Sequence, residues 1–404
     1  MKQRKFLAIL LAALLLLTTA CGAKTDVAQS TPANAGADAA QTEEITVNKK
    51  VALILQQGGL GDQGFNDTAY AGLMECKDRY GLDINYVECT DATQGETLIR
   101  ELCEAGYGMV INLEASISGN MYNVALDYPE IYFIAVGRQL RINPVDGFTE
   151  TPANVIESYI KLNEHSFLAG VAAAFVATEG NNIVDGLGGK DGCNIGVLFG
   201  ADSVGFYQYG DGFRQGALFY NPDAQVYMDF TVGFSDTANA KNIAENMIKN
   251  MNCDVIWTCC GTAGLGGLEA VHLNNAYGIG VDSNQDEVQP GNILTSAIRD
   301  NTALIEFYVD KYLRGDLAQT EPDVFNLANG GVNITDMSTI ARYVTNEEKF
   351  DELKTLLDQC RTWIADGTIE VFDARMASIE ADGQRLDDWM ATSGKFISYS
   401  QLSK

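Results

Sequence analysis

Residues 51–66, VALILQQGGLGDQGFN, decide how the chain begins to fold. The apolar run at 51–55 has the length and the β-branched content of a buried strand. Four glycines follow, at positions 58, 59, 61 and 64, and helical spacing starts at Asn66. The spacing is neither that of a dinucleotide-binding turn nor that of a P-loop, so a nucleotide-phosphate site is a weak interpretation. The stretch predicts a strand, a Gly-rich turn and a helix N-terminus that can present N–H groups to a ligand, although a purely structural turn stays open.

Further along the chain, short apolar runs alternate with longer stretches of helical spacing, which is typical of βα units around parallel sheets. The predicted strands are 51–55, 83–88, 108–112, 131–135, 194–199, 225–230, 255–258, 278–281 and 293–296. We therefore expect an α/β protein of two doubly wound parallel-sheet lobes joined by a multi-crossover hinge. Lobe 1 is predicted at 49–162, completed by about 297–371, and lobe 2 at 163–296, with a C-terminal extension of unassigned role at 372–404. Ligands of such sheets bind at the carboxyl ends of the strands, so the interlobe cleft is the expected site.

The N-terminus predicts export and lipid anchoring. A basic start, an unbroken apolar run at 6–17 and small residues up to position 20 form a signal peptide at 1–20, and the run is too short for a lasting membrane span. Cys21 directly follows, as in a bacterial lipobox, although Thr18 stands where Leu is usual. We expect Cys21 to be acylated and residues 21–48 to form a polar flexible tether. A plain secretory signal with an incidental cysteine is the alternative.

Charge and composition exclude several function classes. The formal charge is −27, and loss of three cations with the signal peptide takes it to −30. No nucleic-acid partner is expected, because phosphate binding needs a surplus of Lys and Arg. Membrane attachment must then rest on the lipid anchor rather than on attraction to anionic lipid.

Side chains suited to catalysis or metal binding are few. The chain has only two histidines, His165 and His272, and neither lies at useful spacing from a nucleophile. Beyond Cys21 there are eight cysteines without a CxxC pair, so no metal and no cofactor are expected. A reactive thiol at Cys259 or Cys260 stays a minor alternative.

Several motifs, in the right order, resemble the basic membrane protein family, the purine nucleoside receptor A-like substrate-binding lipoproteins of ABC importers. The opening 51–66 is similar, and GFSD at 233–236 resembles the family's Gly-Ser-Phe-x-Asp with one residue fewer. Further matches are SFLAG at 166–170, GTAG at 261–264, IGVDSNQ at 279–285, LTS at 294–296 and IADGTIEV at 364–371. The resemblance implies a type I periplasmic-binding-protein fold that closes on a nucleoside-like ligand.

The resemblance also implies ligand contacts. Two family Phe residues that sandwich the base match Phe65 and Phe234, and such stacking is worth about 1–3 kcal/mol per base. Asp282 matches the ribose-binding carboxylate, which can accept two hydroxyl hydrogen bonds. Gly261 lets a ligand approach the backbone closely, and Asn66 contributes an amide. Without the resemblance, burial in the core is the alternative for the two Phe side chains, and a capping role is the alternative for Asp282.

Three more candidate residues depart from the family pattern. Gln56 stands where an acid is common, and Glu114 replaces the Gly of a Gly-Phe pair. Arg299 replaces a Lys that contacts the sugar, which keeps the positive charge but places it on a planar guanidinium fork. Glu114 and Arg299 are candidates to bracket a more polar ligand, although Arg299 is equally interpretable as a surface ion-pair partner. Asp62 adds a carboxylate at the mouth of the first helix.

Together these features predict a monomeric solute-binding lipoprotein on the extracytoplasmic face of a bacterial cell membrane. It would capture a nucleoside-like small molecule and deliver it to an ABC permease, with no chemistry of its own. The alternatives are an extracellular nucleoside-processing enzyme, which could use Asp62, Glu114 or Asp282, and a ligand sensor with the same cleft.

Overall fold

The computed structural model describes residues 47–380 and 383–403. The predicted signal peptide, Cys21 and nearly all of the predicted tether lie outside the described residues. Within the described residues, no helix is both long and apolar enough to cross a membrane.

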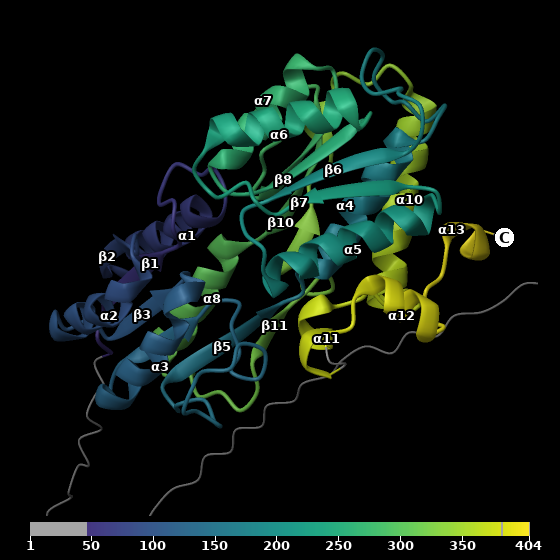
Figure 1. The fold of residues 1–404 in the computed structure, drawn as a ribbon. Coiled ribbons are helices and arrows are strands. Elements are labelled where there is room, and N and C mark those ends of the chain that lie inside the picture. The colour runs from purple at the N-terminus through teal and green to yellow at the C-terminus, as the bar shows by residue number, and fades with distance from the viewer. Residues whose placement is uncertain (1–46, 381–382, 404) are drawn as a thin grey trace, which may run out of the picture. The chain divides into compact units, whose positions relative to one another are not determined.

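The first sheet has six strands in the order β11-β5-β4-β3-β1-β2, and all of its neighbouring pairs are parallel (Figure 1). Its strands are β1 (Lys50–Leu55), β2 (Asp83–Glu88), β3 (Met109–Asn112), β4 (Tyr132–Ala135), β5 (Val155–Ile160) and β11 (Asp323–Phe325). The helices packed with it are α1 (Phe65–Tyr80), α2 (Gly95–Glu104), α3 (Ser118–Asp127) and α8 (Asn301–Arg314).

Strand β1 shows why this sheet is covered on both faces. Val51 and Leu53 point into an apolar cluster that includes Leu73 of α1. The intervening Ala52 and Ile54 point into a separate cluster with residues of α2 and α3. Successive side chains of a strand point to opposite faces, so an unbroken apolar run requires helices on both.

The second sheet has the order β12-β10-β9-β8-β6-β7, and its pairs are parallel except that β12 runs antiparallel to β10. Its strands are β6 (Asn194–Phe199), β7 (Gln225–Asp229), β8 (Val255–Cys259), β9 (Tyr277–Asp282), β10 (Ile293–Arg299) and β12 (Val332–Ile334). Helices α6 (Thr237–Asn250) and α7 (Ala263–Leu273) cover one face, and α4 (Leu162–Ala177) and α5 (Val204–Tyr220) cover the other (Figure 1). The closeness of α4 and α5 depends on Gly170, because a Cβ there would lie 1.9 Å from the carbonyl oxygen of Phe213.

The two sheets confirm the predicted doubly wound α/β class, and all nine predicted strands are present. Strands β5, β11 and β12 were not predicted, and helix α4 begins at Leu162. The lobe boundaries drawn from the sequence stay a prediction. The remaining helical elements are η1 (Ala92–Gln94), η2 (Ala115–Ile117), α9 (Ser338–Ala341), α10 (Glu347–Ala365), α11 (Ala374–Glu380), α12 (Leu386–Thr392) and α13 (Tyr399–Leu402).

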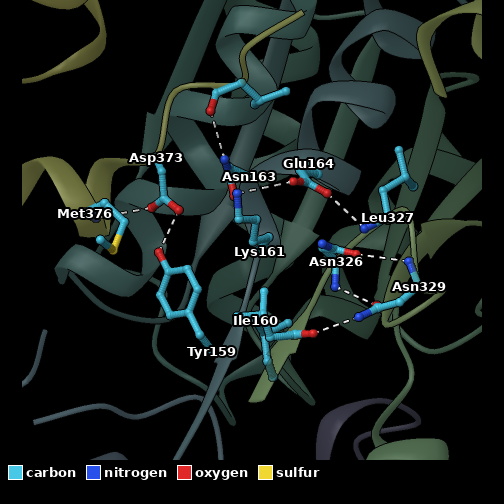
Figure 2. Close-up of polar contacts among 12 residues, drawn as sticks. Tyr159, Ile160, Lys161, Asn163, Glu164, Asn326, Leu327, Asn329, Asp373 and Met376 are labelled. Carbon is cyan, nitrogen blue, oxygen red and sulfur yellow. Dashed lines mark hydrogen bonds and ion pairs between the residues drawn. The ribbon is translucent and has the colours of Figure 1, made fainter. Parts of the chain in front are cut away.

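The chain passes between the sheets several times, and side chains tie these crossings together. At the start of α4, Glu164 accepts a hydrogen bond from the backbone N–H of Leu327, which lies between β11 and β12, at 2.8 Å (Figure 2). The hydroxyl of Tyr159 at the end of β5 donates to Asp373, just before α11, at 2.6 Å (Figure 2). These hydrogen bonds therefore link three connections between the sheets: the one after β5, the one after β11 and the one before α11.

Candidate ligand-binding cavity

A cavity of about 410 Å³ lies where the carboxyl ends of strands from both sheets converge. This is the edge at which ligands of doubly wound sheets bind. All nine residues predicted as ligand contacts line it, and their contact with a ligand stays a prediction. They are Gln56, Asp62, Phe65, Asn66, Glu114, Phe234, Gly261, Asp282 and Arg299.

The Gly-rich loop after β1 is held in shape by two of these residues. The Asn66 side-chain oxygen accepts from the N–H of Gln56 at 2.8 Å, and its amide nitrogen donates to the carbonyl of Gly59 at 3.0 Å. Asp62 is 3% exposed and accepts from the N–H groups of Gly64 and Asn66, both at 2.9 Å, at the start of α1. Burial raises the pKa of Asp62 even though these bonds oppose the rise. Asn66 and Asp62 thus fix the loop with the same polar atoms that were predicted to meet a ligand.

Glu114 and Gln56 differ in how far the protein already satisfies them. The Glu114 carboxylate accepts from the N–H of Gln57 at 2.9 Å and from both the N–H and the hydroxyl of Ser116, at 2.9 and 2.7 Å. It caps the short helix η2 and joins it to the Gly-rich loop. The side-chain amide of Gln56 makes no hydrogen bond to another described residue, so it is available to a ligand.

Arg299, at the end of β10, lies between Phe65 and Asp282. Its guanidinium carbon is 3.9 Å from the centroid of the Phe65 ring, a cation–π contact that covers one face of that ring. Its Nε lies 3.9 Å from Oδ1 of Asp282, which also accepts from the hydroxyl of Tyr209 at 3.2 Å. The sequence predicted these side chains as neighbours of a ligand, but it did not predict their contact with one another.

Asp282 has a strained backbone and a perturbed carboxyl group. Its φ angle is +64°, a conformation that non-glycine residues rarely adopt and that is common at functional sites. Burial raises its pKa, and the nearby Arg299 acts in the opposite direction. The turn after β9 therefore holds a partly desolvated carboxylate at the cavity wall.

Phe234 and Gly261 form the opposite part of the wall, from the second sheet. Phe234 is half-buried, and its ring centroid is 6.0 Å from that of Phe206. Gly261 has a φ of +56°, and a Cβ there would lie 3.3 Å from the carbonyl oxygen of Phe234. The absence of that Cβ keeps the backbone accessible beside the aromatic ring.

Sequence reasoning missed other lining residues. Arg138 and Asn143 follow β4, and the rule that sites form at strand ends could have indicated them. Tyr209 and Phe206 lie on α5, and neither was singled out from the sequence. Arg375 comes from the C-terminal extension, for which no sequence signal existed.

Catalytic groups are not gathered in the described part of the chain. No cluster of three potential metal ligands occurs among the described residues. His165 is buried and burial lowers its pKa to about 3, whereas His272 contacts the side-chain oxygen of Asn292 at 2.9 Å. The eight described cysteines are unpaired and buried, and burial raises the pKa of the cavity-lining Cys259 well above its usual range, which disfavours the thiolate.

Among the described residues, two doubly wound sheets bring their strand ends together around a cavity of small-molecule size. Among solved structures, an ABC transporter solute-binding protein from Aeropyrum pernix K1 superposes with a TM-score of 0.66 at 20% identity, covering 80% of this chain and 92% of that one. A second, from Conexibacter woesei, gives a TM-score of 0.61 at 21% identity and covers 80% of this chain and 98% of its own. The fold is therefore the type I periplasmic-binding-protein fold, as expected.

The sequence model of the ABC transporter substrate-binding PnrA-like proteins matches residues 49–360, and this chain belongs to that family. A nucleoside-binding ABC transporter protein, BmpA of Lactococcus lactis, is 26% identical over 81% of this chain and 90% of its own length. Basic membrane protein A of Borreliella afzelii is 27% identical over 66% of this chain and 75% of its own.

Family membership establishes the general role. Substrate-binding proteins of ABC transporters are extracytoplasmic, bind small molecules and deliver them to a permease, and they are not enzymes. The alternatives of a nucleoside-processing enzyme and of a sensor find no support.

Proposed function

We propose that this chain is a lipid-anchored binding protein that delivers a nucleoside-like ligand to its permease. The observation that carries the proposal is that nine residues, chosen from the sequence for such a ligand, converge on one cavity of about 410 Å³. That volume lies within the range of roughly 300–1,000 Å³ that is typical of small-molecule sites. The name of the Lactococcus lactis relative supports the same ligand class.

The proposed contacts use the groups that the protein itself leaves accessible. Phe234 offers a ring for stacking, the amide of Gln56 can donate to and accept from a base edge, and Asp282 can accept from sugar hydroxyls. Asp62, Asn66 and Glu114 would act by fixing the loops around the ligand.

A thermal-shift screen followed by calorimetry tests the ligand class. A nucleoside at a hundred times its dissociation constant should stabilise the protein by about 2.7 kcal/mol. Asp282→Ala should weaken nucleoside binding, whereas Asp202→Asn should not, because Asp202 is exposed and lies between two lining residues without lining the cavity. If sugars or amino acids shift the melting temperature and no nucleoside does, the nucleoside assignment is wrong.

We further propose that Cys21 carries the lipid anchor and that the protein is a monomer. Cells fed a clickable fatty acid should label the natural chain and not its Cys21→Ser variant. The Cys21→Ser protein should elute as a monomer in size-exclusion chromatography with light scattering. Labelling of that variant would contradict the anchor, and a stable dimer would contradict the monomer.

A further inference from the structure

Three guanidinium groups from distant parts of the sequence line the same cavity. Arg138 follows β4 of the first sheet, Arg299 ends β10 of the second, and Arg375 belongs to α11 in the C-terminal extension. Arg375 lies beyond residues 49–360, the part that matches the family model.

Arg375 is held rigidly with part of its donor capacity unused. It is only 2% exposed, and its Nη2 donates to the carbonyl of Gly137 at 2.9 Å and to the side-chain oxygen of Asn143 at 3.0 Å. Its Nε has no hydrogen-bond partner among the described residues. A guanidinium fixed in this way is already oriented for a ligand at the cavity wall.

Three carboxylates line the cavity beside these cations, but none of them forms a direct ion pair with Arg138 or Arg375. Asp62 and Glu114 are occupied by backbone N–H groups, and Asp282 approaches only Arg299, at 3.9 Å. Within the described ranges, neither Arg138 nor Arg375 forms an ion pair, and Arg138 donates only to the carbonyl of Gly137, at 3.3 Å. Burial and the neighbouring Arg375 and Arg299 lower the pKa of Arg138 to about 9, although the charge of Glu114 acts in the opposite direction. A buried guanidinium without a direct ion-pair partner is costly, so an anion that reaches both Arg138 and Arg375 would be stabilised there.

We propose that Arg138, Arg299 and Arg375 form a subsite for an anionic group, a phosphate or a carboxylate, on the ligand. Planar guanidinium forks bind both groups through paired hydrogen bonds. The inference rests on the proposed function and specifies its ligand class: a nucleoside-like molecule that carries an anion, such as a nucleoside monophosphate.

Calorimetry with matched ligands tests the subsite in the full mature chain. The ligands are adenosine, its 5′-monophosphate and its 5′-carboxylate, uridine and its 5′-monophosphate, and ribose and ribose 5-phosphate. The natural protein should bind the anionic member of each pair at least roughly tenfold more tightly than the neutral one. Comparing the 5′-phosphate with the 5′-carboxylate identifies which anion the subsite prefers.

Three substitutions test whether the anion preference comes from the cavity arginines or from general surface charge. Arg138→Gln should reduce the preference for the anion roughly tenfold to a hundredfold, because it removes charge-assisted hydrogen bonds. Arg141→Gln removes a cation from the same loop, but Arg141 is 60% exposed and does not line the cavity, so the preference should persist. Arg375→Lys keeps the charge and loses the fork, and should give an intermediate preference if it folds.

The outcomes distinguish this inference from the proposed function. Tight binding of neutral nucleosides with no anion preference overturns the subsite and leaves the nucleoside function in place. Binding of ribose 5-phosphate alone supports the subsite and overturns the nucleoside function. An anion preference that Arg138→Gln leaves intact, or an absence of binding to every ligand, overturns the subsite.

Discussion

The ion pair between Arg385 and Asp211 should contribute measurably to stability, because it fastens the C-terminal extension to α5. Arg385 Nε and Nη2 donate to the two carboxylate oxygens of Asp211 at 2.9 and 3.1 Å, and its guanidinium carbon is 4.0 Å from the centroid of the Tyr207 ring. The Asp211 residue is only 3% exposed, whereas the Arg385 side chain is 45% exposed. Arg385→Gln would therefore leave a buried carboxylate without its cation.

The size of the effect follows from this mixed exposure. Breaking a fully buried pair costs about 3–5 kcal/mol, but water can replace part of a half-exposed arginine, so we expect about 1.5–3 kcal/mol. For a chain of this length, about 2 °C per kcal/mol predicts a fall in Tm of roughly 3–6 °C. Thermal and urea unfolding of the ligand-free protein measure the change.

Arg214→Gln is the matched control. Arg214 also joins α5 to the extension, through Asp387 at 2.7 Å, but the Asp387 side chain is 68% exposed, so its loss should cost about 0–1 kcal/mol. The Asp211→Asn/Arg385→Gln double variant should be more stable than the sum of the single losses predicts. Equal melting of the Arg385 and Arg214 variants, or strict additivity in the cycle, would refute the reasoning.

Three further predictions follow from the cavity and the core. Burial raises the pKa of Asp282, so its carboxylate is protonated at a higher pH than a free aspartate. The affinity for neutral nucleosides, measured by calorimetry, should therefore weaken from neutral pH toward about pH 4, and Asp282→Asn should reduce this pH dependence. Phe234→Ala should cost about 1–3 kcal/mol of nucleoside binding, whereas Phe230→Ala, which removes a ring stacked on Phe199, should leave affinity unchanged; equal losses would argue against stacking. The eight buried thiols should resist a thiol reagent in the folded Cys21→Ser protein and all react in denaturant, and rapid reaction of any in the folded state would contradict their burial.

Nine of the twelve strands in the described residues could be predicted from the sequence, whereas β5, β11 and β12 could not, and β5 shows one physical reason. Strand β5 is buried along its whole length although it contains Glu157 and Ser158. The Glu157 carboxylate accepts from the hydroxyl of Tyr122 and from the N–H of Leu140, and the Ser158 hydroxyl accepts from the N–H of Gly137. A polar pair inside a buried strand is acceptable only when such partners exist, and they come from distant parts of the chain.

The cavity residues also differ in whether their position follows from the local sequence or from contacts with distant parts of the chain. Gln56, Glu114, Gly261 and Asp282 all lie at or just beyond the end of a strand, and parallel strands bring those ends to one edge. Their convergence could therefore be predicted without knowing any contact. Arg375 could not, because its position depends on how the extension packs rather than on a strand of its own.

The position of Arg375 depends on both sheets at once. Asp373, just ahead of it, accepts from the hydroxyl of Tyr159 on β5 (Figure 2). It also accepts from the amide of Gln208 on α5 at 3.2 Å, so this crossing is tied to both halves of the fold. In the proposed subsite, Arg138 belongs to the first sheet and Arg299 to the second, and their like charges repel across the cavity. An anion between them would replace that repulsion with contacts to both sheets, and a ligand stabilises a closed arrangement only through such differential contacts. Arg375 of the extension would then increase the affinity for an anionic ligand and help the bound anion stabilise the closed arrangement of the two sheets.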